Sequence, residues 1–138
     1  MTASSGYSGT PLARKLGIKP ASTLCVVNAP DDYAALVAPL PDGVLITSQF
    51  DAGTDLVHAF VTEREELAEI LTSTRERLRD DAVLWVSWPK KASKVPTTVT
   101  EDVVRELGLP LGFVDVKVCA VDAVWSGLKL VVRKELRR

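Results

Sequence analysis

Three lysines follow an apolar stretch and form the densest basic group of the sequence. The segment LWVSWPKKASKVP (84–96) runs through Trp88 and a proline into Lys90, Lys91 and Lys94. Ammonium groups attract phosphate or carboxylate, and an indole ring can cover an apolar part of the same ligand. The pattern predicts that Trp88 and the three lysines bind an anion. A solvated basic loop without a ligand is the alternative that the same pattern fits.

Asn28 is a further candidate for ligand contact, because it directly follows a short apolar segment, TLCVV (23–27). The next residues, Ala-Pro-Asp-Asp (29–32), contain no glycine and add two carboxylates. A dinucleotide or adenosyl cofactor needs glycine after the first strand, and a phosphate also needs free N–H groups. We therefore expect no cofactor, although a neutral adenosyl group is harder to exclude than a pyrophosphate.

The other residues with catalytic chemistry favour structural roles. His58, the only histidine, alternates with Leu56 and Phe60 in an apolar segment, which is typical of a core histidine. Four glutamates between positions 63 and 69 fit the solvated first turns of a helix, where its dipole favours carboxylates. The sequence has no GxSxG elbow and no histidine spacing typical of a metal site. We therefore expect no catalytic residues and no metal site.

Composition narrows the classes of partner. Seventeen basic and eighteen acidic side chains leave a net charge of -1, so nucleic-acid binding through a positive field is not expected. Cys25 and Cys119 lie far apart in apolar runs, which predicts buried free thiols. No apolar run reaches the roughly 18 residues of a membrane span, and residues 1–9 lack the apolar core of a secretion signal. We expect a cytoplasmic protein without a membrane partner, binding a small anionic ligand or another protein.

The elements that must position these residues alternate between strands and helices. Apolar runs and turn residues predict strands at 23–28, 44–49, 56–61 and 82–88, helices at 12–17, 31–37, from 62 and from 101, and a hairpin of 113–121 with 128–136. Thr62 and Glu65 form a capping box for the longest helix, and Thr98 or Thr100 caps the next one. In the hairpin, strict alternation should place Asp115 on one face of its strand.

These elements predict an α/β fold, a small Rossmann-like three-layer α/β/α sandwich. Its sheet is expected to be mostly parallel, with a C-terminal antiparallel hairpin at one edge. The length of 138 residues fits a flexible start, 1–9, and a single domain, 10–138. The exposed hairpin edge could serve as the interface of a homo-oligomer.

Four segments together resemble a bacterial family known as domain of unknown function 3052. They are YSGTPLARKLGIKP (7–20), LWVSWPKKASKVPT (84–97), TVTEDVVRELGLPLG (98–112) and VDVKVCAVDAVWSGLKLVVRK (114–134). The Asn-Ala-Pro step at 28–30 also agrees with that family. The resemblance covers nearly the whole chain but implies no activity, substrate or catalytic residue.

The expected fold is also similar, more loosely, to class I methyltransferases, whose parallel sheets end in an antiparallel hairpin. Here the chain is one strand–helix unit short and lacks their glycine-rich first loop. Two functions remain open: a non-catalytic binding or regulatory protein, and a reduced methyltransferase-like or nucleotide-handling enzyme. The missing glycine loop and the missing acid, base or nucleophile favour the first.

Overall fold

A six-stranded sheet forms the centre of the protein in the computed structural model, which describes residues 11–137. Its strands are β1 (Thr23–Val27), β2 (Leu45–Thr47), β3 (Leu56–Phe60), β4 (Val83–Pro89), β5 (Phe113–Ala120) and β6 (Trp125–Val132), in the order β2-β1-β3-β4-β6-β5. The first four are parallel, and β6 is antiparallel to both β4 and β5. The predicted mostly parallel sheet with its antiparallel hairpin is confirmed.

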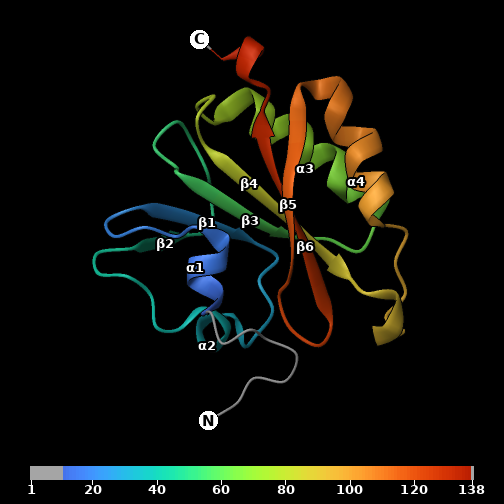
Figure 1. The fold of residues 1–138 in the computed structure, drawn as a ribbon, viewed down its shortest axis with the longest axis horizontal. Coiled ribbons are helices and arrows are strands. Elements are labelled where there is room, and N and C mark those ends of the chain that lie inside the picture. The colour runs from blue at the N-terminus through green and yellow to red at the C-terminus, as the bar shows by residue number, and fades with distance from the viewer. Residues whose placement is uncertain (1–10, 138) are drawn as a thin grey trace.

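Helices cover both faces of this sheet (Figure 1). The helices are α1 (Leu12–Leu16), α2 (Tyr33–Val37), α3 (Arg64–Arg77) and α4 (Glu101–Gly108), with short 3-10 turns at η1 (Lys91–Ser93), η2 (Leu109–Leu111) and η3 (Lys134–Leu136). Leu16 and Val37 of α1 and α2 belong to one apolar core. Leu67 and Val104 of α3 and α4 belong to the other. The predicted three-layer sandwich is therefore confirmed.

Alternation along the strands fills these two cores. In β4, Trp85 faces α1 and is fully buried, and its indole Nε1 donates to the carbonyl of Leu16 at 2.9 Å. This bond satisfies the one polar atom of the indole and fixes the short α1 to the sheet. Cys25 and Cys119 are buried and unpaired, as predicted. Within the described residues no helix has the length and apolar character that crossing a membrane requires.

The start of α3 differs from the predicted capping box. The N-cap residue is Glu63, and its side chain makes no capping hydrogen bond. The N–H of Arg64 instead donates to Oγ1 of Thr98 at 2.7 Å, while the carbonyl of Thr62 accepts from the N–H of Thr98. The Thr62 and Glu65 prediction is wrong because a side chain distant in sequence caps this helix. Thr100 caps α4 as predicted, with its Oγ1 accepting from an N–H in the first turn.

Two smaller differences concern α1 and β5. Pro11 is the N-cap of α1, and Gly17 follows its last residue in the left-handed conformation. The predicted flexible start 1–9 lies outside the described residues. In β5 an irregularity between Asp115 and Lys117 breaks the strict alternation. Beside this irregularity Asp115 pairs with Arg105 of α4 at 2.9 Å.

Candidate functional site

The order of the strands places a candidate site between β1 and β3. In the sheet, β2 lies on one side of β1 and β3 lies on the other, so the direction of the connections reverses at β1. Ligands of open α/β sheets bind at such a reversal, beyond the carboxyl ends of the strands. Asn28 lies there, directly after β1. Its Nδ2 donates to the carbonyl of Phe60 at the end of β3 at 3.2 Å, and to Oε2 of Glu66 on α3 at 2.9 Å. We use the name β1–β3 crevice for the position at the strand ends that these three residues define.

The backbone of Asn28 resembles that of glycine at this position. Its φ of +57° lies in the left-handed region, which asparagine tolerates better than most residues. The turn after β1 can therefore be tight although no glycine is present. The difference from a glycine turn is the Asn28 amide, which bonds to the end of β3 and to α3.

Acceptor oxygens dominate the chemistry of the β1–β3 crevice. Within residues 11–137 Oδ1 of Asn28 has no hydrogen-bond partner, and Glu66 brings a carboxylate. Asp31 and Asp32 are exposed in the turn that follows. Such groups suit hydroxyls, ammonium groups and other cations, and they repel phosphate. The first N–H of α3, on Arg64, already donates to a threonine hydroxyl and is not available to a pyrophosphate.

The lysine group lies beyond the end of β4, which is separated from β1 by β3. Lys91 and Lys94 are exposed around the short η1, and Lys90 is half-buried with its N–H bonded to the carbonyl of Val124 at 2.7 Å. Within the described residues none of the three lysines forms a salt bridge. No described contact joins Asn28 to them, so the structure does not assemble all predicted site residues into one cluster.

The position of Trp88 differs from the predicted one. Its side chain is only 7% exposed and belongs to the core beneath α3 and α4. Alternation along β4 explains this, because Trp88 points to the same face as Leu84 and Val86. The ring therefore packs against apolar side chains and is not displayed beside the lysines. Whether the three lysines bind an anion stays a prediction.

A buried polar chain on the other face of the sheet was not predicted from the sequence. His58, fully buried, has Nδ1 3.0 Å from the hydroxyl of Tyr33 on α2 and Nε2 2.7 Å from Oγ of Ser87 on β4. Desolvation lowers the pKa of His58 from 6.5 to about 3, and burial also raises the pKa of Tyr33. The ring stacks on Phe60 with centroids 4.3 Å apart. His58 is thus a neutral core residue, as its alternation indicates.

Sequence reasoning missed Tyr33 and Ser87 because neither lies near His58 in the chain. Ser87 was part of a predicted strand and Tyr33 part of a predicted helix, without a signal that linked them. Among residues 11–137 no group of three or more His, Cys, Asp or Glu side chains could hold a metal ion.

The fold is that of methyltransferase-like Rossmann proteins. A SAM-dependent methyltransferase from Aquifex aeolicus matches with a TM-score of 0.64 and 15% identity, covering 88% of this chain and 87% of that protein. A putative type 11 methyltransferase from Sulfolobus solfataricus matches with a TM-score of 0.54 and 14% identity, covering 84% of this chain and 74% of that protein. A tRNA methyltransferase from B. subtilis matches with a TM-score of 0.60 and 10% identity, covering 84% of this chain and 62% of that protein.

These identities show a common fold and nothing finer. No protein-family model and no curated sequence matches this chain. The resemblance to the domain of unknown function 3052 therefore stays a prediction, whereas the looser resemblance to class I methyltransferases is confirmed at the level of the fold.

Proposed function

We propose that this protein binds a cationic, hydroxyl-bearing adenosyl ligand of the adenosylmethionine class in the β1–β3 crevice. The observation that carries the proposal is the Asn28 amide, which spans the strand reversal and is held by Phe60 and Glu66. Adenosylmethionine has a sulfonium cation, an ammonium group and ribose hydroxyls. These groups complement the acceptor oxygens of the crevice, whereas the phosphates of nucleotides do not.

The likeness to methyltransferases supports the methyltransferase-like alternative over the non-catalytic function that the sequence favours. Oδ1 of Asn28 and the carboxylate of Glu66 would accept hydrogen bonds from the ligand, which when bound supplies an activated methyl group. The protein itself would orient the ligand, and its carboxylate would stabilise the positive charge of the ligand. We further propose that residues 10–138 act as a single domain in this role.

A second candidate function is anion binding by the lysines that follow β4. The observation in its favour is that Lys90, Lys91 and Lys94 have no salt bridge within residues 11–137. In this case the protein would be a non-catalytic binding or regulatory protein, and the ligand would be a small anion or an acidic partner protein.

Calorimetric titration with adenosylmethionine, adenosylhomocysteine and ATP tests the first candidate. Adenosylmethionine should bind, and ATP should bind much more weakly or not at all. Asn28→Ala and Glu66→Gln should each weaken binding about tenfold, a loss of about 1.4 kcal/mol.

Glu65→Gln is the matched control, because Glu65 lies in the same first turn of α3 but has no described bond to Asn28. This variant should bind as the parent does. Equal affinity for ATP and adenosylmethionine, or no effect of Asn28→Ala and Glu66→Gln, would contradict the proposed site.

A further inference from the structure

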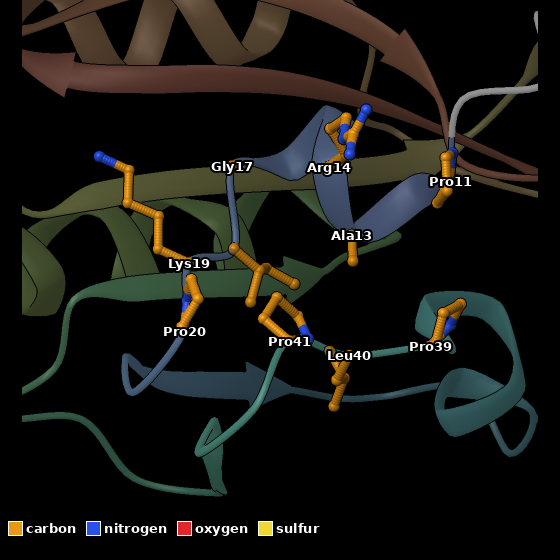
Figure 2. A pocket seen from close by; sticks show the side chains of 10 residues that line it. Pro11, Ala13, Arg14, Gly17, Lys19, Pro20, Pro39, Leu40 and Pro41 are labelled. Carbon is orange, nitrogen blue, oxygen red and sulfur yellow. The ribbon is translucent and has the colours of Figure 1, made fainter.

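A separate cavity lies between α1 with its following turn and the proline-rich segment 39–41. It has a volume of about 520 Å³, within the range of small-molecule sites. Figure 2 shows Pro39, Leu40 and Pro41 along one side and Ala13 on the opposite side. We call it the proline cavity. Its lining shares no residue with the β1–β3 crevice, so the inference below does not rest on the proposed function.

The walls of the proline cavity are apolar and held in place by the fold. Ala13 and Ile18 belong to the buried core beside it, and Leu40 packs against that core. The helix that carries Ala13 is fixed to the sheet by the bond from Trp85 to Leu16. The N–H of Ile18 donates to the carbonyl of Ala13 at 3.0 Å, which closes the turn after the helix. Apolar walls on a fixed backbone favour a ligand with an apolar body.

Two cations line the same cavity on the side of α1. Arg14 and Lys19 contribute to its wall, and both side chains are exposed. In Figure 2 their charged ends point away from Pro39, Leu40 and Pro41 and lie apart from each other. Within residues 11–137 neither forms a salt bridge. In a chain of net charge -1, this is a local excess of positive charge.

A neighbouring cavity provides a contrast. It shares Lys19 with the proline cavity but is also lined by Asp55, Asp81 and Arg79. Arg79 bonds to both carboxylates there, at 2.8 Å and 3.0 Å, so those charges are already paired. Lys19 lines both cavities, so Arg14 is the unpaired cation that distinguishes the proline cavity from this neighbour, and the two cations complement an anion.

From these observations we propose that the proline cavity binds an amphiphilic anion, a compact apolar ring system that carries a carboxylate. The ring system occupies the space between Ala13 and Leu40. The carboxylate lies at the edge of the cavity on the side of α1, where the positive charges of Arg14 and Lys19 attract it. Arg14 presents a planar fork that fits a carboxylate, and Lys19 adds a second charge.

A matched pair of probes tests the proposal: naphthalene-2-carboxylate and the uncharged naphthalene-2-methanol. Both are titrated into the full chain while backbone amide signals are followed by NMR. The carboxylate should bind about tenfold more tightly than the alcohol. Both should shift the amide signals of Ala13, Gly17 and Ile18, and raising the ionic strength to about 0.5 M should weaken the binding of the carboxylate alone.

Variants separate the roles of charge and apolar contact. The double variant Arg14→Gln and Lys19→Gln should weaken carboxylate binding about tenfold and leave alcohol binding unchanged. Leu40→Ser should weaken both probes to a similar extent. The control Arg77→Gln and Lys134→Gln removes the same charge at two exposed positions outside both proposed anion sites, and it should change the affinity for neither probe.

Three results would overturn the proposal. They are equal, salt-independent affinity of the two probes, an unchanged carboxylate affinity in the double variant, and amide shifts centred on another part of the sheet. An equal loss of affinity in the Arg77 and Lys134 control would also overturn it, since the effect would then come from total charge. The salt dependence of the parent chain tests the proposal even if the double variant fails to fold.

Discussion

Asn28 and His58 show how the environment sets the role of a single polar side chain. Asn28 is exposed at a strand end, and its amide joins β1, β3 and α3. His58, two residues before Phe60 in the same strand, is fully buried. Each of its ring nitrogens lies within hydrogen-bond distance of a hydroxyl group. Burial keeps the imidazole neutral at physiological pH, which suits a structural role in the core.

His58 should make the stability of the protein depend on pH. Its pKa is about 3 in the folded state and 6.5 ordinarily, so the unfolded chain binds a proton that the folded chain excludes. The stability that this pKa difference contributes is fully present above the pKa of His58 in the unfolded chain. It is lost as the pH falls toward the pKa of His58 in the folded chain. Between about pH 6 and pH 5 the free energy of unfolding should fall by about 1.4 kcal/mol per pH unit. Urea unfolding at several pH values measures this slope.

The single histidine of the chain makes this test specific, since carboxylates add to the slope mainly below about pH 5. His58→Gln keeps polar atoms for Tyr33 and Ser87 but cannot titrate. It should be less stable than the parent and should lose the slope in this interval. A parent chain whose stability is constant from pH 6 to about pH 5 would refute the buried neutral state.

Among the elements, α3 shows how a segment distant in sequence can define where a helix begins. Thr98 precedes α4 and caps α3 by accepting from Arg64, and Thr97 donates its hydroxyl to the carbonyl of Thr62 at 2.7 Å. The turn before α4 therefore connects the two helices that cover this face of the sheet. Arg64 also pairs with Glu106 of α4 on the surface.

Thr98→Ala should lower the free energy of unfolding by about 1 kcal/mol, because it leaves the N–H of Arg64 without its side-chain acceptor. Thr62→Ala serves as the comparison, since in the structure only the backbone carbonyl of Thr62 takes part. Chemical denaturation should show a clearly smaller loss for Thr62→Ala. The reverse order would restore the capping box as the element that begins α3.

The lysine turn after β4 should tolerate substitution without loss of the fold. Replacing Lys90, Lys91 and Lys94 by alanine should change the free energy of unfolding by less than about 1 kcal/mol, because exposed charges contribute little. If these lysines bind an anion, the same variant should bind that anion more weakly and with a smaller dependence on salt. Inorganic phosphate and an acidic peptide are suitable probes. Unchanged binding of a probe that binds the parent would identify the turn as merely solvated.

At the scale of the whole molecule, the sheet has two exposed edges. β2 is a three-residue edge strand with Leu45 and Ile46 exposed, and β5 forms the other edge with Val116 and Val118 exposed. Unpaired edge strands can pair with another chain, although the irregularity in β5 opposes this. A homo-oligomer through the C-terminal hairpin stays a prediction.

The chain as a whole should not bind NAD, FAD or ATP with physiological affinity. The turn after β1 contains Pro30, Asp31 and Asp32 where a phosphate would need N–H donors and no negative charge. Calorimetry at physiological salt should give no binding of these three nucleotides at micromolar concentrations. Micromolar affinity for any of them would show that phosphates bind by a route that avoids this turn.

The sequence by itself determined the layers, the mostly parallel sheet and the C-terminal hairpin, because alternation and helical periodicity are local properties of the chain. It also predicts that a phosphate site after β1 is disfavoured, because residues 29–32 supply two carboxylates and a proline without an N–H. Only the tertiary structure decided that Trp88 lies in the core, that Thr98 caps α3 and that Asn28 joins Glu66. These contacts cross many residues of sequence, and their geometry exists only after the sheet has brought its strands and helices together.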